Sequence, residues 1–219
     1  MRTFVMSDIH GNNKLFQSAL RKILFKKTDK LILLGDLIDR GKESKAVLDT
    51  VLLLLDKGYN VELIMGNHEA MFLDAFQDAN KLNQWLLNGG DKTLLSFLTS
   101  SIEKIPKIYF DLIKSFKYYI EEQNFILVHA AINMKIEYPY SDIKTMLWER
   151  EPSNLLNKNW LGNRRVIHGH NPKSQTEILK SLENKESIIC IDNGCFLNKN
   201  DFGSVCILQL ENLTPYFII

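Results

Sequence analysis

A chain of 219 residues with 45% hydrophobic and 24% charged residues has the composition of an ordinary globular protein and is long enough to bury a substantial core. Its 27 Lys and Arg against 26 Asp and Glu exclude a large basic field that would attract nucleic acid or an anionic membrane surface. The longest apolar run, VLLLL at 51–55, is far shorter than a membrane span, and the start MRTFVMSD lacks the apolar stretch of a signal peptide. We therefore expect a cytoplasmic protein with no nucleic-acid or membrane partner.

The cysteines give no sign of a disulfide framework or a metal site. Cys190, Cys195 and Cys206 are an odd number and lack the spacing of zinc ligands. We expect them to be free thiols, buried in a reducing compartment. Nothing in the composition indicates the oligomeric state.

Strands and helices alternate in the first half of the chain. The apolar run RTFVMS predicts a strand at 2–7, and apolar residues at helical spacing predict a helix over 13–26. Pro106 suits the first turn of a helix that runs to about residue 115. The other elements expected here are strands at 30–35 and 60–65, helices at 43–57, 68–80 and 91–100, and a break at NGGD (88–91).

Strands dominate the second half. KYYIEEQNFILVHA (117–130) predicts a hairpin that leads into a strand, and further strands are expected at 164–169, 187–192, 204–210 and 214–219. No repeat, low-complexity tract or Pro/Gly-rich linker marks a domain boundary. We predict a single domain over 1–219 with a layered α/β architecture and partly mixed sheets.

Polar side chains follow five of the predicted strands, at the point where each strand ends. Ligands in α/β proteins gather outside the carboxyl ends of strands, so these side chains are expected to meet. Oxygen and nitrogen donors together suit Mn, Fe or Zn, and the absence of cysteine argues against a soft-metal or iron–sulfur site. One histidine at a strand end is usually structural, but five such ends predict a metal site. The residues are Asp8, His10, Asp36, Asp39, Arg40, Asn67, His68, His129, His168 and His170.

Five ordered blocks, SDIHGN, GDLIDRG, GNHE, HAA and HGH, carry a family resemblance. The chain resembles the calcineurin-like metallophosphoesterases, and the forms of its second and third blocks are closest to the phosphoprotein phosphatase branch. NQWLLNGGDKTL (83–94) and MLWERE (146–151) are similar to the small bacterial and phage serine/threonine phosphatases. The resemblance spans residues 3 to about 196. It implies the α/β/β/α sandwich of metallo-dependent phosphatases, with mixed sheets.

The resemblance also implies two divalent metal ions, with Mn expected first and Fe or Zn as alternatives. Asp8 and His10 would hold one ion, and Asp36 would bridge to the other. A carboxylate suits the bridge because its two oxygens can neutralise two neighbouring cations. The remaining ligands of the second ion would be Asn67, His129 and His170.

The roles of the remaining block residues follow from the same resemblance. A hydroxide bridging the two ions would attack phosphorus, while Arg40 and Arg150 bind the phosphate oxygens. His68 would protonate the leaving group, and Asp39 would orient its imidazole. Two plainer interpretations stay open: Asp39 and Arg40 as a surface turn, and Arg150 as part of a solvated ion cluster.

Four further features receive structural interpretations. Trp85 is expected to be core packing, and the loop at 88–90 to border the cleft. Glu69 stands in the first turn of a helix, where a carboxylate is stabilising, and receives no catalytic part. His168 would point to the same side as His170 if the segment stays extended, as a supporting partner or a spare metal ligand, and the plainer alternative is a simple packed or exposed side chain.

The sequence favours a two-metal phosphomonoesterase that acts on phosphoserine and phosphothreonine in proteins. The alternative is a diadenosine tetraphosphate hydrolase, which would take a phosphorylated small molecule instead. An inactive metal-binding scaffold is disfavoured because every expected ligand and the acid are present. A nuclease is disfavoured by the near-neutral charge.

Overall fold

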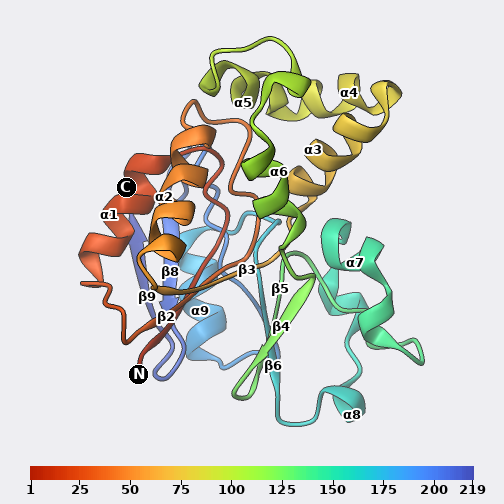
Figure 1. Cartoon of the computed structure of the whole chain (residues 1–219). Helices are drawn as coiled ribbons and strands as arrows, with labels where there is room; N and C mark the ends of the chain where they lie inside the picture. The colour runs from red at the N-terminus through yellow and green to blue at the C-terminus, as the bar shows by residue number, and fades with distance from the viewer.

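Two mixed β-sheets pack face to face in the computed structural model, which describes residues 1–219 (Figure 1). In the first sheet, the strand order is β3-β2-β1-β8-β9. β1, β2 and β3 are parallel, whereas β8 pairs antiparallel with both β1 and β9. The strands are β1 (Thr3–Met6), β2 (Lys30–Leu33), β3 (Asn60–Leu63), β8 (Val205–Gln209) and β9 (Thr214–Ile218).

The second sheet has the order β4-β5-β6-β7. β5, β6 and β7 are parallel, and β4 pairs antiparallel with β5. Both sheets are therefore mixed, as predicted. The strands are β4 (Tyr119–Glu122), β5 (Phe125–Val128), β6 (Arg165–His168) and β7 (Ile188–Cys190).

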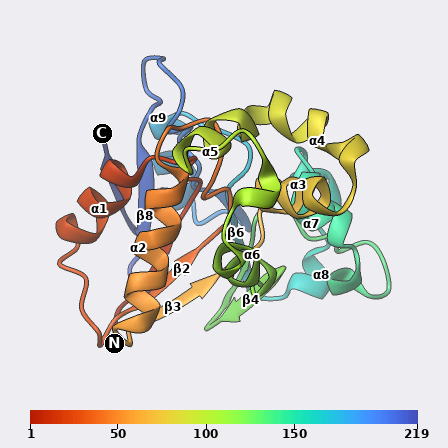
Figure 2. The ribbon, with the colours of Figure 1, turned by 45° about the horizontal axis from the view of Figure 1, so that its top comes forward.

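Helices cover the two outer faces. α1 and α2 lie on one side of the sandwich and α7 and α8 on the other, with α3, α4 and α5 beyond one end of the strands (Figures 1 and 2). No helix is both long enough and apolar enough to span a membrane. The helices are α1 (Asn13–Lys22), α2 (Ser44–Asp56), α3 (Asn67–Gln77), α4 (Ala79–Trp85), α5 (Asp91–Ser96), α6 (Lys107–Lys114), α7 (Ile143–Trp148), α8 (Lys158–Leu161) and α9 (Gln175–Glu183).

Strand alternation separates the core into layers. On β2, Leu33 joins the cluster under the helices, whereas its neighbour Ile32 joins the cluster between the sheets, where Leu127 of β5 also lies. On the outer face of β5, Val128 packs in a third cluster with Met146 of α7. This alternation confirms the predicted α/β/β/α sandwich.

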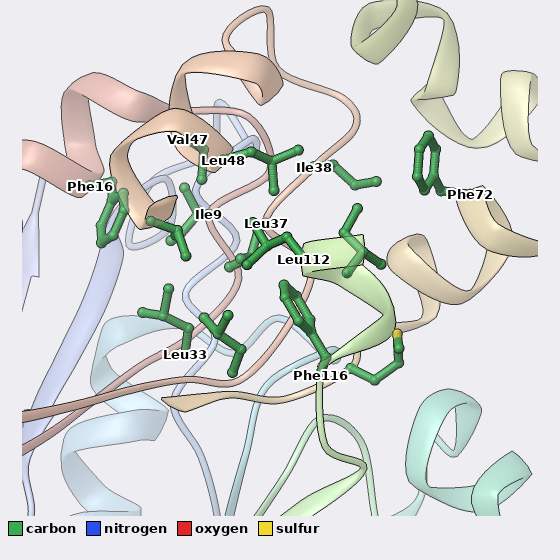
Figure 3. Packing of buried hydrophobic residues seen from close by; sticks show 14 of the residues in the cluster. Ile9, Phe16, Leu33, Leu37, Ile38, Val47, Leu48, Phe72, Leu112 and Phe116 are labelled. Atoms are coloured by element: carbon green, nitrogen blue, oxygen red, sulfur yellow. The ribbon is translucent and has the colours of Figure 1, made fainter. Parts of the chain in front are cut away.

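The cluster under the helices fixes the loops that follow the first strands. Figure 3 shows Phe16 of α1 and Val47 of α2 near Leu33 and the loop residue Leu37, and Phe72 of α3 farther along the same cluster, beyond Ile38. All six side chains have at most 1% of their surface exposed. The helices and the loops therefore share one packed core.

Several short helices were not predicted. α7 and α8 span only Ile143–Trp148 and Lys158–Leu161, so neither is long enough for an apolar period to be recognised. α9 begins with a capping box of Ser174 and Glu177, a signal that the sequence does carry. The predicted helix over 13–26 ends at Lys22, since Leu24 adopts a left-handed backbone with φ +49°.

Candidate metal centre

Side chains from both sheets meet at the carboxyl ends of β1, β2, β3, β5 and β6. They come from loops and from the first turn of α3, and each has at most 6% of its surface exposed. The sequence predicted that these residues would meet, because ligands in α/β proteins gather outside the carboxyl ends of the strands. The residues are Asp8, His10, Asp36, Asn67, His68, His129 and His170.

One compact group contains Asn67, His129, His170 and Asp36. Asn67 Oδ1 lies 3.0 Å from His129 Nε2 and 3.0 Å from His170 Nδ1, and these two nitrogens are 3.1 Å apart. Asp36 Oδ1 lies 3.4 Å from His129 Nε2. The four residues are the set expected to hold the second ion.

Asp36 also belongs to a second group. Its Oδ2 lies 3.6 Å from His10 Nε2 and 3.9 Å from His68 Nε2, and the three side chains could hold an ion together. The carboxylate of Asp36 thus faces both groups, which is the position that a bridging ligand needs.

The spacing of these donor atoms fits a metal ion. Ligands about 2.1 Å from an ion, at tetrahedral or octahedral angles, lie roughly 3.0–3.5 Å from one another. His129 Nδ1 donates to the carbonyl of Leu34 at 2.8 Å, and His10 Nδ1 to that of Ile38 at 3.2 Å. These bonds leave each Nε2 unprotonated, so that its lone pair can bind a metal, the usual arrangement of metal-binding histidines. The buried Nε2 of His170 has no hydrogen-bond partner.

The charges of the buried groups also favour a cation. Burial raises the pKa of Asp8 well above its usual value, and the neighbouring Asp192 and Asp36 raise it further. Burial also raises the pKa of Asp36, but four surrounding histidines hold it below its usual value. Burial lowers the pKa of His10 and of His129. Neutral imidazoles beside crowded carboxylates are the state that a divalent cation stabilises.

Asp8 lies against the loop after β6 and outside both three-residue groups. Its two carboxylate oxygens lie 3.1 and 3.2 Å from the backbone nitrogen of His170, which donates to them. Gly169 allows this approach, because a Cβ at that position would collide with the Asp8 carboxylate. Asp8 therefore links the end of β1 in one sheet to the end of β6 in the other.

Asp192 was missed in the sequence. It is buried with 1% of its surface exposed, and it accepts a hydrogen bond from the backbone of Gly194 at 2.7 Å. Burial, with a contribution from Asp36, raises its pKa to about 7. The signal was present, because SIICID also ends an apolar strand in a carboxylate.

Strained backbone turns the site residues toward one another. His10, Asp36 and His170 have φ values of +45°, +51° and +67°, and Asp39 and Arg40 have +69° and +65°. Left-handed backbone conformations are unfavourable for residues other than glycine, and they are frequent at functional sites.

Glu69 holds the strained turn after β2 in place. Its carboxylate accepts hydrogen bonds from the backbone nitrogens of Asp36 and Leu37, both at 2.8 Å, and of Gly66 at 3.1 Å. Leu37 and Ile38 point into the core (Figure 3), so the flanking Asp36 and Asp39 face the site. The role of Glu69 is thus structural, and it orders two of the site loops.

His68 and Asp39 form a buried pair. His68 Nδ1 lies 2.8 Å from Asp39 Oδ2, and burial lowers the pKa of His68 less than Asp36 and Asp39 raise it. Trp85 Nε1 donates to the same oxygen at 2.9 Å, and Thr93 Oγ1 donates to Oδ1 at 2.6 Å. Trp85 was expected only to pack in the core; it does so, but it also orients Asp39. The buried Asp39 is no part of a plain surface turn.

Arg40 lies at the edge of the centre. Its Nη1 is 3.2 Å from His10 Nε2, and its guanidinium carbon is 4.2 Å from the centre of the Phe196 ring. The backbone nitrogen of Arg40 donates to the carbonyl of Gly89 at 3.3 Å. The loop at 88–90 therefore borders the site and supports Arg40.

Arg150 is exposed and stands beside His170. Its backbone carbonyl accepts a hydrogen bond from Asn171 Nδ2 at 2.9 Å, and its guanidinium forms no ion pair with Glu149 or Glu151. Burial, His129 and, to a smaller extent, Arg150 lower the pKa of His170 to about 3. The positive charge of Arg150 thus affects His170 electrostatically.

His168 does not accompany His170. It is buried, and its Nδ1 lies 3.0 Å from the carbonyl of Gly169. The left-handed backbone of His170 breaks the strand alternation, so the extended segment assumed in the sequence does not exist there. The two imidazoles consequently face different surroundings.

A sequence profile described as calcineurin-like phosphoesterase matches residues 1–201. The serine/threonine-protein phosphatase 2 of Salmonella typhimurium is 36% identical over 159 residues, which cover 68% of this chain and 67% of that protein. The protein of the same name from Escherichia coli is 48% identical over 89 residues, covering 40% of this chain and 38% of that protein. The symmetrical bis(5'-nucleosyl)-tetraphosphatase of Erwinia tasmaniensis is 32% identical over 148 residues, 66% of this chain and 48% of that protein.

Solved structures share the fold. A protein serine/threonine phosphatase from Saccharomyces cerevisiae matches with a TM-score of 0.67 at 15% identity, covering 100% of this chain and 79% of that one. A metallophosphoesterase from Sphaerobacter thermophilus matches with a TM-score of 0.62 at 16% identity, covering 100% of this chain and 88% of that one. At such low identity the likeness concerns the fold alone.

Proposed function

Because the chain belongs to the calcineurin-like phosphoesterase family, we propose that it is a metal-dependent phosphatase that hydrolyses phosphoserine and phosphothreonine esters in proteins. The observation that carries this proposal is the position of Asp36, whose two carboxylate oxygens face two separate groups of metal-binding side chains. The similarity to serine/threonine-protein phosphatases over about two thirds of each chain supports the choice of substrate.

The expected ligands are divided between the two sheets. Two divalent ions, Mn first with Fe or Zn as alternatives, would supply an activated water and neutralise phosphate charge when bound. Asp8, His10 and Asp36 would hold one ion. Asp36, Asn67, His129 and His170 would hold the other. Asn67 contributes a neutral oxygen, which leaves more positive charge for the phosphate.

The chain's own residues bind the phosphate and move the proton. Arg40 donates to the phosphate oxygens from the edge of the centre, and Arg150 does so from the side of His170. His68 Nε2, which is buried without a partner, donates its proton to the leaving oxygen of serine or threonine. Asp39 stabilises the protonated imidazole through its 2.8 Å contact with Nδ1.

A dinucleoside polyphosphate hydrolase is the second candidate. The symmetrical tetraphosphatase of Erwinia tasmaniensis is 32% identical to this chain, although the match covers 48% of that protein. The same metal centre and arginines would serve either substrate, because both reactions break a phosphorus–oxygen bond.

The deciding experiment compares a phosphothreonine peptide with diadenosine tetraphosphate at equal concentration in the presence of Mn²⁺. We expect the peptide to have the higher kcat/KM, p-nitrophenyl phosphate to be hydrolysed, and a chelator to stop every reaction. Faster turnover of the dinucleotide would overturn the choice of protein substrate. Inactivity on all three substrates with Mn²⁺, Fe²⁺ or Zn²⁺ would overturn the proposal as a whole.

A further inference from the structure

A second pocket lies next to the metal centre. It has a volume of about 350 Å³ and lies between α9, the segment before α9 and the 3-10 turn at Pro152–Leu155. Arg150 and Asn171 form the wall nearest the centre, because Asn171 follows His170 and its side chain donates to the Arg150 carbonyl at 2.9 Å. The pocket therefore borders the centre on the side of His170.

Three cations line the pocket without an ion-pair partner. Arg150, Lys173 and Lys180 have no carboxylate within 4.0 Å of their charged nitrogens. Of the three acids in the same lining, Glu177 already accepts hydrogen bonds from Ser174, and Glu186 accepts one from Ser181. The third acid, Glu151, makes no ion pair either, so the lining has no net charge, but the charged nitrogens of the three cations are each free to bind an anion from the substrate.

His168 determines a second property that a ligand of this pocket needs. It has 3% of its surface exposed and lies in the pocket wall. Its Nδ1 is 3.0 Å from the carbonyl of Gly169, and a carbonyl only accepts, so Nδ1 carries the proton. The other nitrogen, Nε2, makes no hydrogen bond within the protein and is not among the fully buried unpartnered atoms, so it is an acceptor that solvent or a ligand can reach. A well-matched ligand therefore brings an N–H or O–H donor as well as an anion.

We propose that this pocket binds an acidic residue next to the phosphorylated residue of a peptide substrate. Its carboxylate, or a second phosphate, would lie on Lys173 and Lys180, and a backbone N–H would donate to His168. No Phe, Tyr or Trp lines the pocket, which leaves only the His168 imidazole and the Arg150 guanidinium as surfaces on which a nucleobase could stack, so a peptide fits better than a nucleoside. The inference rests on the proposed phosphatase function and narrows its substrate class.

The test uses two phosphothreonine peptides that differ only in having Glu or Gln on both sides of the phosphothreonine. For the wild-type protein with Mn²⁺, we expect kcat/KM to be roughly tenfold higher for the Glu peptide, the effect of one charge-assisted hydrogen bond. In the Lys173→Ala, Lys180→Ala double variant the ratio should fall close to one. Lys22→Ala, an exposed change on α1, should keep the wild-type ratio.

A binding measurement separates this inference from the proposed function. Fluorescence anisotropy of the labelled peptides in EDTA should give tighter binding of the Glu peptide to the wild type and equal binding to the double variant. Equal affinity of the two peptides for the wild type would overturn the inference even if the enzyme is active. A double variant that keeps the Glu preference but loses kcat/KM on diadenosine tetraphosphate would also overturn it, and would assign the pocket to polyphosphate. Absence of all hydrolysis, with the binding preference intact, would count only against the proposed function.

Discussion

The two ring nitrogens of His68 have different surroundings. Nδ1 is held by Asp39, whereas Nε2 is buried without a hydrogen-bond partner and lies 3.9 Å from Asp36 Oδ2. A nitrogen in this position serves either as a metal ligand or as a proton donor to the substrate. Burial lowers the pKa of His68, but Asp36 and Asp39 raise it above its usual value, which favours the proton donor.

We expect His68→Asn to lower kcat by about 10²–10⁴, the usual contribution of a general acid, while the metal content stays unchanged. Asparagine cannot supply the proton but leaves the Asp36 and His10 donors in place. Steady-state kinetics on p-nitrophenyl phosphate and metal analysis of the purified variant check the two parts. Loss of metal together with activity would identify His68 as a ligand instead.

Trp85 orients the His68–Asp39 pair through a hydrogen bond to Asp39. Its Nε1–H donates to a carboxylate that is itself fully buried. In Trp85→Phe the ring still fills most of the space, but Asp39 loses one of its donors. We expect the free energy of unfolding to fall by about 1.5–3 kcal/mol, the contribution of one hydrogen bond to a charged group, and kcat to fall with it, while His68 still donates to the same oxygen.

Urea denaturation measures this loss, and Trp148→Phe provides the matched control. Trp148 has 40% of its surface exposed and its indole makes no hydrogen bond, so its replacement should change stability by less than about 0.5 kcal/mol. Equal stability of the two variants would contradict the proposed role of the Trp85 hydrogen bond.

At the scale of elements, the chain between α4 and α5 supports Arg40, the residue proposed to bind phosphate. The turn Leu86–Gly90 follows α4 and is kinked at Gly89, which has the non-helical φ +105°. Its carbonyl accepts the backbone N–H of Arg40, and a Cβ on Gly89 would lie 2.6 Å from that nitrogen. Only glycine permits both the backbone conformation and the close approach.

Gly89→Ala is therefore expected to raise KM for p-nitrophenyl phosphate by about tenfold, because displacing Arg40 removes a charge-assisted contact to phosphate. Gly58→Ala is the control, since Gly58 also has φ +73° but no atom lies within 4 Å of an added Cβ. Both variants should lose about 1 kcal/mol of stability through backbone strain. Steady-state kinetics measures the change in KM, and thermal unfolding measures the loss of stability. An unchanged KM in Gly89→Ala would contradict the proposal that Gly89 holds Arg40 in position.

For the whole molecule, the centre joins the two sheets. Asp8 and Asp36 extend from the first sheet, and His129 and His170 from the second. The expected ligands span more than 160 positions of the sequence, so they come together only in the folded state. Metal ions held by these residues would stabilise the native state alone, because the unfolded chain does not bring the residues together.

We expect Mn²⁺ at a hundred times its Kd to raise the free energy of unfolding by about 2.7 kcal/mol, and EDTA to reverse the change. Asp36→Asn should lose both this stabilisation and the phosphatase activity, because it removes charge from both metal groups. Asp56→Asn, whose side chain has 72% of its surface exposed, should keep both. Thermal unfolding with and without Mn²⁺ makes the comparison; a full Mn²⁺ shift in Asp36→Asn would contradict the bridging position.

Local sequence patterns predicted the helices and strands whose formation is favoured by their own consecutive residues. Apolar strands such as β1 and β2, and amphipathic helices such as α1 and α6, are encoded in consecutive residues. α7 and α8 are too short for a period to emerge. The sequence pattern did not predict how His168 and His170 lie relative to each other. The left-handed backbone of His170 breaks the strand alternation between them, and no pattern of residue types specifies such a conformation.

The sequence by itself determined the family and the set of donors at the strand ends, because ordered blocks of residues carry that chemistry whatever their exact placement. Only the tertiary structure decided that Asp36 belongs to two groups, that Asp8 lies against the backbone of His170, and that Trp85 donates to Asp39. These relations depend on how two sheets pack and on strained turns held by long-range hydrogen bonds. They arise between residues far apart in the chain, so no local pattern contains them.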